Sequence, residues 1–226
     1  MSGFTYWQRA ENVFPDVRNI FCVGRNYRDH AAELGNQVPT SPMIFGKFTH
    51  ALTAARDTVP FPVGRAEIHH ELEIVLWIDH AIANGERPEQ AIGAIALGLD
   101  LTDRALQSQL KTQGHPWEAA KSFRHSAIVS DFYSFSSFSD VTDSTFAMTV
   151  NGRQVQIGQP QDMVFSFAAL IRHCAQTYGL NRGDLIFTGT PAGVGPLQAG
   201  DEVVLTMNGE IWATFCMTET DEGGKA

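Results

Sequence analysis

Cysteine is scarce in this sequence, which has three residues of this type, Cys22, Cys174 and Cys216. They are odd in number and far apart, so they do not suggest a disulfide framework, and none lies at metal-ligand spacing from a second cysteine. Isolated thiols of this kind are typical of a protein in a reducing compartment. We therefore expect a cytoplasmic protein without a structural zinc site.

Long apolar runs and basic clusters are also missing. No apolar stretch approaches the roughly 18 residues that a transmembrane helix needs, and the start, MSGFTYWQRAENVF, lacks the basic and apolar segments of a signal peptide. The formal net charge is −9, with 16 Lys and Arg against 25 Asp and Glu. Because phosphate binding depends on clustered Lys and Arg, we expect neither a nucleic-acid-binding protein nor a membrane protein.

Strands and helices do not alternate regularly, which disfavours a doubly wound α/β sheet. Apolar runs bounded by turn residues predict strands at Asn19–Gly24, Met43–Phe45, Glu73–Ile78, Ala94–Leu101, Phe146–Val150, Asp184–Thr188, Glu202–Met207 and Ile211–Met217. Helices are predicted at Tyr27–Leu34, from about Pro88, at Asp103–Thr112 and at Met163–Tyr178. The pairs Asn151-Gly152 and Asn208-Gly209 predict hairpins. The pattern favours a strand-rich α+β fold, a β-roll or sandwich, in one domain spanning 1–226.

Two glutamates introduce the strongly apolar strand in HHELEIVLWI, residues 69–78. Side chains alternate along a strand, so Glu71 and Glu73 share one face, roughly 6–7 Å apart. Asp100 follows the apolar run 94–99 in a similar position. Carboxylates so close to a core are costly unless a cation neutralises them. Oxygen ligands without cysteine favour Mg²⁺, Mn²⁺ or Ca²⁺, so the three residues predict an open metal site with room for substrate.

Other interpretations of this stretch remain open from the residues alone. The glutamates could end a solvent-facing strand and pair with Lys or Arg, which is the common fate of carboxylates. A zincin motif is excluded because its second histidine would fall at Ile74. A cupin-like oxygenase would need histidine ligands for Fe(II), and the sequence gives it little support.

Fragments along nearly the whole chain resemble the fumarylacetoacetate hydrolase superfamily, and within it the small single-domain acylpyruvase/oxaloacetate branch. They are FCVGRNYRDHAAELG (21–35), PMIFGK (42–47), HHELEIVLWI (69–78), GLDLTDRALQ (98–107), PWEAAKSF (116–123), VNGRQVQIG (150–158), DMVF (162–165) and GDLIFTGTPAGVGPLQAGD (183–201). The resemblance implies a mixed β-sandwich roll, usually a homodimer, whose metal ligands fall on Glu71, Glu73 and Asp100. It implies Mg²⁺, with Mn²⁺ as the alternative, and 2-oxo acid substrates such as acylpyruvates, fumarylpyruvate-like dioxo acids and oxaloacetate. The chain departs from the family pattern after Asp100, Lys47 and Phe123, where TDRA, Phe48 and RHSAI replace more frequent residues.

Three further residues are candidate catalytic groups. His30 and Glu33 share one face of the predicted helix, where they form either a local surface pair or, as the family suggests, a general base and its orienting carboxylate on a lid at 27–36. Lys121 falls on the K-S-F lysine of the family. It is either a surface lysine or a point charge for a developing enolate oxygen, and its bulky neighbours Trp117 and Phe123 favour the second role.

Candidate substrate-binding residues are Arg25, Gln107 and Thr190. The glycine-rich run 188–196 lacks the Gly-Lys-Ser/Thr of a P-loop. It is either a plain turn or a carboxylate-binding loop that uses backbone N–H groups and the Thr190 hydroxyl. The segments 1–18 and 219–226 are expected to form an N-terminal arm and a frayed tail.

The predicted chemistry begins with a 2-oxo acid chelated to Mg²⁺, which makes the C3 protons acidic and stabilises an enolate. Reprotonation gives enol–keto tautomerisation, loss of CO₂ gives decarboxylation, and water attack on a 4-carbonyl gives C–C hydrolysis. Motif segments carry five basic residues, which favour a substrate with a second carboxylate: Arg25, Arg28, Lys47, Arg104 and Lys121. We therefore expect oxaloacetate tautomerisation, with decarboxylation as a further exit and an acylpyruvate or fumarylpyruvate hydrolase as the alternative. A non-catalytic 2-oxo-acid-binding protein is a third hypothesis, but it would not need His30, Glu33 and Lys121.

Overall fold

A computed structural model describes residues 8–10, 14–33, 35, 37–62, 64–65, 67–83 and 85–219. Parts of three predicted segments lie outside these residues: 1–7 and 11–13 of the N-terminal arm, 34 and 36 of the lid, and 220–226 of the tail. Within the described ranges no helix is both long and apolar enough to cross a membrane.

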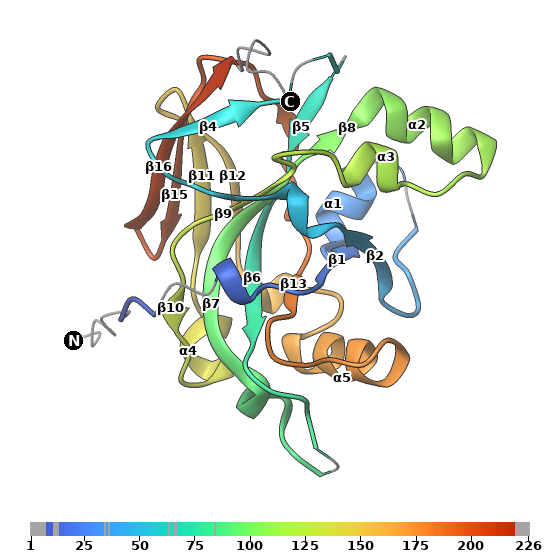
Figure 1. Ribbon diagram of the computed structural model, residues 1–226, viewed down its shortest axis with the longest axis vertical. Helices are drawn as coiled ribbons and strands as arrows, with labels where there is room; N and C mark the ends of the chain where they lie inside the picture. Colours follow the sequence, from blue (N-terminus) through green and yellow to red (C-terminus); the bar gives the residue numbers. More distant parts are fainter. Residues whose placement is uncertain are drawn as a thin grey trace.

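A mixed eight-stranded sheet forms the centre of the molecule (Figure 1). Its strands are β1 (Ile20–Gly24), β2 (Met43–Lys47), β3 (Leu52–Ala54), β6 (Leu72–Ile78), β7 (Ile92–Asp100), β9 (Ala127–Val129), β10 (Tyr133–Ser134) and β13 (Leu185–Phe187). They follow the order β2-β1-β13-β6-β7-β9-β3, and β10 pairs with β7. The pairs β1–β13 and β3–β9 are parallel, while the others are antiparallel.

A second, five-stranded sheet has the order β12-β11-β15-β16-β4. It contains β4 (Thr58–Phe61), β11 (Phe146–Val150), β12 (Arg153–Gly158), β15 (Glu202–Met207) and β16 (Glu210–Glu219). Both predicted hairpins are present, with φ of 51° and 75° at Asn151 and Gly152 and of 52° and 80° at Asn208 and Gly209. Positive φ at both central residues is what a type I′ turn requires. A small sheet, β14-β5-β8, joins β5 (Ile68–His70), β8 (Thr102–Asp103) and β14 (Gly195–Pro196).

Both faces of β6 are buried, which explains why its sequence is apolar at every position from Ile74 to Ile78. Ile74 and Leu76 belong to a core shared with the five-stranded sheet, where Met148 and Leu205 also lie. The alternate residue Trp77 packs into a separate core on the other face of the large sheet. A strand covered on both sides is apolar at every position and does not alternate.

Helices lie outside these sheets: α1 (Arg28–Glu33), α2 (Arg104–Gln113), α3 (Glu118–Lys121), α4 (Phe138–Thr142) and α5 (Phe167–Thr177). Short 3₁₀ turns occur at Phe14–Asp16, Thr49–Ala51, Pro88–Ala91 and Pro160–Asp162. The α2 helix starts where the Asp103 carboxylate accepts a hydrogen bond from the backbone N–H of Leu106, and it ends at Gly114, whose φ is 67°. In Figure 1, α1, α2 and α3 gather at one end of the large sheet, away from α5. The predicted strand-rich α+β fold is confirmed.

Candidate active site and metal centre

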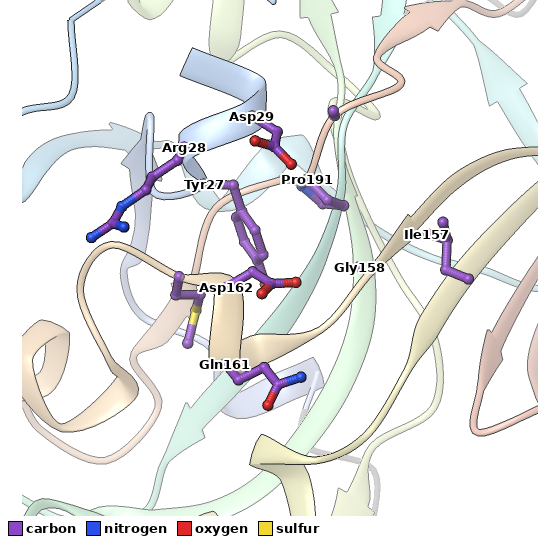
Figure 2. Close-up of a pocket in the computed structure, with 10 residues that line it drawn as sticks. Tyr27, Arg28, Asp29, Ile157, Gly158, Gln161, Asp162 and Pro191 are labelled. Carbon is purple, nitrogen blue, oxygen red and sulfur yellow. The ribbon is translucent and has the colours of Figure 1, made fainter. Parts of the chain in front are cut away.

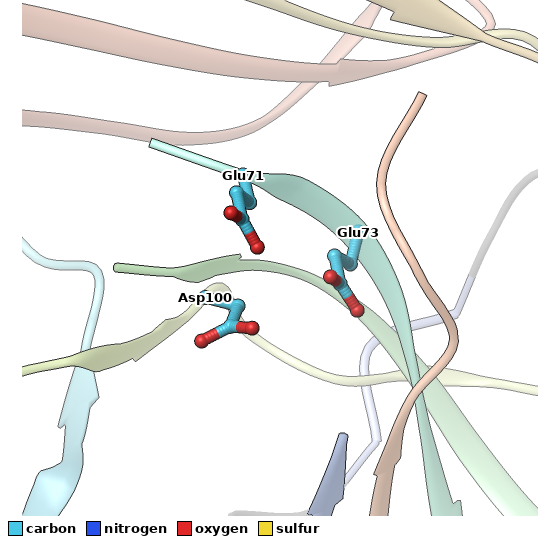
Figure 3. A group of neighbouring side chains, drawn as sticks. All are labelled: Glu71, Glu73 and Asp100. Atoms are coloured by element: carbon cyan, nitrogen blue, oxygen red, sulfur yellow. The ribbon is translucent and has the colours of Figure 1, made fainter. Parts of the chain in front are cut away.

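Strand pairing brings the three predicted metal-binding carboxylates together. Leu72 of β6 lies opposite Leu99 of β7, and the backbone N–H of Asp100 donates to the Glu71 carbonyl at 2.9 Å. Glu73 is on β6 and Asp100 ends β7, whereas Glu71 occupies a one-residue break between β5 and β6. One oxygen from each carboxylate lies within 4.8 Å of the others (Figure 3). The expected juxtaposition therefore exists, although β5 and β6 are separate strands and do not form one continuous strand.

All three carboxylates are buried, with Glu71, Glu73 and Asp100 only 6 %, 2 % and 1 % exposed. The alternative of a solvent-facing strand end is therefore wrong. That alternative also expected the carboxylates to pair with Lys or Arg. Such pairs do form, but they are buried inside the protein. Buried charges of this kind need compensation by cations and hydrogen bonds.

Three basic side chains surround two of the carboxylates. The Lys121 ammonium lies 2.7 Å from an oxygen of Glu71 and 2.7 Å from one of Asp100, while Arg104 Nη2 lies 2.6 Å from Glu71 and Lys47 Nζ 2.7 Å from Asp100. Lys121 is 3 % exposed, so it is not a surface lysine. Burial opposes its charge, but the Asp100 and Glu71 carboxylates outweigh that effect and hold the pKa of Lys121 above its usual range. Lys121 is therefore an ammonium ion within the site.

Glu73 differs from the other two carboxylates. Its carboxylate accepts a hydrogen bond from the backbone N–H of Gly189 at 2.7 Å, and no basic side chain in the described chain comes within ion-pair distance of it. Burial, and then repulsion from Asp100 and Glu71, raises the pKa of Glu73 well above its ordinary value. A divalent cation would relieve this repulsion, and oxygen-only donors suit Mg²⁺ or Mn²⁺. The residues thus fit the metal that the family implies.

The predicted base and its partner are in contact beside this cluster. His30 on α1 is 5 % exposed, and its Nδ1 lies 3.3 Å from a Glu33 oxygen. Because a carboxylate only accepts hydrogen bonds, Nδ1 carries the proton and Nε2 of the neutral ring is free to accept one. Burial is the main cause that lowers the pKa of His30. Glu33 also accepts from the backbone N–H of Gly193 at 3.2 and 3.3 Å, which ties α1 to the glycine-rich loop.

A small cavity of about 40 Å³ collects eight of the nine predicted site residues: Arg25, His30, Glu71, Glu73, Asp100, Gln107, Lys121 and Thr190. Glu33 joins them through His30. Phe45 and Trp117 contribute aromatic walls. Gln107 is 6 % exposed and accepts a hydrogen bond from Arg104 at 2.8 Å, while Thr190 is 4 % exposed. The structure therefore brings the predicted catalytic, metal and substrate-binding candidates into one place.

A larger pocket of about 320 Å³ borders the start of α1, and none of the nine predicted site residues lines it (Figure 2). Tyr27, Arg28, Asp29 and Asp162 are among its walls. The size of a hollow therefore does not identify the chemical site in this protein. The buried carboxylates and their partners do.

Gln156 is a site-positioning residue that the sequence does not reveal. Its amide oxygen accepts from His70 Nδ1 at 2.8 Å and from the backbone N–H of Leu72 at 2.9 Å. Its amide nitrogen donates to the Thr190 hydroxyl at 2.8 Å and to the Pro191 carbonyl at 3.0 Å. With four bonds and 1 % exposure, Gln156 joins the strand junction beside the carboxylates to the Thr190 loop.

The replacement Gln156→Glu tests this link. The new carboxylate keeps the size of the side chain but cannot donate, so it repels the Pro191 carbonyl, and the Thr190 hydroxyl must turn round to donate to it. Each lost buried hydrogen bond costs about 1–3 kcal/mol, so we expect kcat to fall roughly tenfold or more. Mg²⁺ affinity should change much less.

Steady-state kinetics and calorimetric Mg²⁺ titration measure the two effects. Gln154→Glu is the matched control, because Gln154 is an exposed residue of the same strand. Equal kinetic parameters for the two variants would contradict a positioning role for Gln156.

Comparison with known proteins places the chain in a class. Residues 19–216 match the family described as fumarylacetoacetate (FAA) hydrolase C-terminal, and the chain belongs to this family. The predicted family is therefore confirmed.

Two related sequences and one solved structure are similar to nearly the whole chain. Oxaloacetate tautomerase YcgM of Escherichia coli (strain K12) is 38 % identical over 211 residues, which cover 92 % of this chain and 96 % of the relative. Human mitochondrial oxaloacetate tautomerase FAHD1 is 36 % identical over 206 residues, covering 88 % and 90 %. A crystal structure of fumarylpyruvate hydrolase from Pseudomonas aeruginosa with Mn²⁺ and pyruvate superposes with a TM-score of 0.84 at 28 % identity, covering 90 % of this chain and 91 % of that one. These similarities confirm the prediction of an enzyme.

Proposed function

We propose that this chain is a Mg²⁺-dependent oxaloacetate tautomerase formed by a single catalytic domain. One observation carries the proposal: His30, Lys121 and three buried carboxylates meet in one small cavity. A simple binding protein would need the carboxylates but not the paired base and the lysine. The names of the relatives support the same reaction.

Glu71, Glu73 and Asp100 are the proposed metal ligands. When bound, a divalent ion supplies Lewis-acid polarisation of the 2-oxo group. Mg²⁺ is favoured because hard cations prefer oxygen donors, and Mn²⁺ shares that preference. The related hydrolase that was crystallised with Mn²⁺ and pyruvate supports a divalent ion in this fold.

His30 carries the proton in the proposed reaction. Its Nε2 takes a proton from C3 of the keto form while Glu33 holds Nδ1 and fixes the orientation of the ring. The C–H electron pair becomes the new C2–C3 double bond, and negative charge develops on the 2-oxo oxygen. The Lys121 ammonium stabilises this charge. His30 then delivers its proton to the oxygen, which gives the enol, and the reverse sequence gives the keto acid.

The charge of the site favours a dianionic substrate. Three carboxylates are matched by the basic side chains of Lys47, Arg104 and Lys121. A divalent ion therefore leaves a positive surplus, which oxaloacetate with two carboxylates neutralises better than a monoanion. We propose that Arg25, Gln107 and Thr190 contact the substrate.

C–C bond hydrolysis is the second candidate, and the structural similarity to a fumarylpyruvate hydrolase favours it. The same His30–Glu33 pair would activate a water molecule for attack on a 4-carbonyl group. The two candidates share the metal ligands and Lys121. They differ in whether the base acts on carbon or on water.

A direct experiment separates the candidates. Purified enzyme with Mg²⁺ is added to freshly dissolved enol-oxaloacetate, and the loss of enol absorbance is followed while pyruvate is assayed. Acetylpyruvate is tested in parallel. We expect rapid loss of the enol without release of pyruvate. Cleavage of acetylpyruvate much faster than conversion of enol-oxaloacetate would make the protein a hydrolase.

We also propose that the protein is cytoplasmic and forms a homodimer. Its three free thiols support a reducing compartment. Exposed apolar side chains beside the open edge of β2, Phe48 at 59 % and Tyr178 at 52 % exposure, support a surface for a second copy. Light scattering during size-exclusion chromatography measures the oligomeric state.

A further inference from the structure

Two basic side chains at the site cavity are not used by the carboxylate cluster. Arg25 and Lys111 both line the cavity, and within the described part of the chain neither lies within ion-pair distance of a carboxylate. In contrast, Arg104 and Lys121 already contact Glu71. On the side of the cavity formed by the turn after β1 and the last turn of α2, two positive charges are therefore not paired with a carboxylate of the described chain.

The placement of these two residues is specific. Arg25 adopts a left-handed backbone with φ of 58°, a conformation that residues other than glycine rarely take and that gathers at binding sites. Lys111 lies over the Trp117 ring, with its ammonium 5.8 Å from the ring centroid. Burial, and then repulsion from Arg25 and Arg104, lowers the pKa of Lys111.

We propose that Lys111 and Arg25 form a subsite for the distal carboxylate of a short 2-oxo dicarboxylic acid. This subsite selects dicarboxylates over 2-oxo acids with neutral tails. The inference rests on the proposed function, because the substrate must place its 2-oxo acid end at Glu71, Glu73 and Asp100. A guanidinium offers paired donors to a carboxylate and an ammonium offers a point charge, so together they hold one distal carboxylate. The Trp117 and Phe45 rings also line the cavity, and the Lys111 side chain reaches it from the exposed surface of α2.

Kinetic selectivity is the first test. Lys111→Met should lower kcat/KM for enol-oxaloacetate roughly tenfold, because a charge-assisted contact is lost. The kcat/KM for acetylpyruvate, which has no distal carboxylate, should not change. Lys111→Arg should restore the selectivity, because it keeps the charge. Arg172→Met is the matched control, since Arg172 is an exposed residue of α5 that does not line the cavity.

Ligand binding gives a second readout that does not depend on turnover. L-malate and 2-hydroxybutyrate have the same chain length and differ in the distal carboxylate, and neither can enolise. In calorimetric titrations of the Mg²⁺-loaded protein, we expect malate to bind roughly ten- to a hundredfold more tightly. Lys111→Met and Arg25→Gln should each reduce the difference, and the double variant should remove it. The preference should also weaken as salt is added.

The outcomes separate the subsite from the reaction. If the wild-type enzyme converts oxaloacetate but Lys111→Met affects both substrates equally and keeps the malate preference, the subsite is overturned and the proposed function stands. If the wild-type protein does not convert oxaloacetate, yet prefers malate through Lys111, the subsite stands and the proposed function fails.

Discussion

Glu73→Gln should lose divalent-metal binding while the protein stays folded. Among the described residues no basic side chain lies within ion-pair distance of the Glu73 carboxylate, and burial, followed by repulsion from Asp100 and Glu71, raises its pKa. An amide of the same shape removes that repulsion and keeps an oxygen to accept from the Gly189 N–H. Because a metal ion supplies several kcal/mol of transition-state stabilisation, we expect turnover to fall roughly a thousandfold or more.

Calorimetric Mg²⁺ titration and thermal melting in a chelator measure the two halves of this prediction. Glu202→Gln, at an exposed position of β15, is the control. Full-strength Mg²⁺ binding by Glu73→Gln would refute the metal site. Asp100→Asn should behave differently, because it also leaves Lys47 buried without a charged partner and removes one of the two carboxylates that contact Lys121. Breaking a buried pair in this way costs about 3–5 kcal/mol, so that variant should lose stability as well as metal.

His30→Ala should lower turnover by roughly 10²–10⁴, the range that a general base contributes, with little change in Mg²⁺ affinity. The ring is buried beside the carboxylates and bonds to Glu33, but it is not among the three clustered carboxylates. His80→Ala serves as the control, because His80 is exposed and does not line the site cavity. An equal loss of ligand binding and turnover would instead make α1 a clamp without a base.

The pH profile provides an independent check on the base. His30 must be neutral to accept a proton, and burial lowers its pKa from the ordinary value of 6.5. The activity is therefore complete above this lowered pKa and is lost as the pH falls through it. We expect the acid limb of kcat/KM, measured at saturating Mg²⁺, to have a midpoint below 6.5. A midpoint above that value would argue against His30 as the base.

Features encoded over a few neighbouring residues could be predicted from the sequence. The turns at Asn151-Gly152 and Asn208-Gly209 rest on residues that tolerate positive φ, and the cap at Asp103 rests on a carboxylate three residues before its donor. The cluster of three carboxylates was predictable because each of them lies at or next to the end of an apolar strand. Their pairing across β6 and β7 follows from two strands that the apolar pattern already indicates.

Features that depend on distant partners could not be predicted from local patterns. Lys47 bonds to the carbonyl of Leu101, 54 residues away, and Gln156 to the backbone of Leu72, 84 residues away. Both residues lie in fragments that the resemblance covers, but nothing in the neighbouring sequence indicates which distant atoms they contact. Short elements such as α3 and α4 have too few residues for a periodic pattern, so packing against the rest of the molecule must stabilise them.

The position of β13 has a consequence for synthesis of the chain. This strand, Leu185–Phe187, lies between β1 and β6, although both of those are translated far earlier. At about 5–20 residues per second, a ribosome spends several seconds making the chain between β6 and β13. During that time β1 and β6 lack the strand that pairs with both of them. Gly189, whose backbone N–H donates a hydrogen bond to the Glu73 carboxylate, also lies after β13 in the sequence. The edges that β1 and β6 present to β13 therefore stay unpaired until the last quarter of the sequence emerges, and they need protection until then.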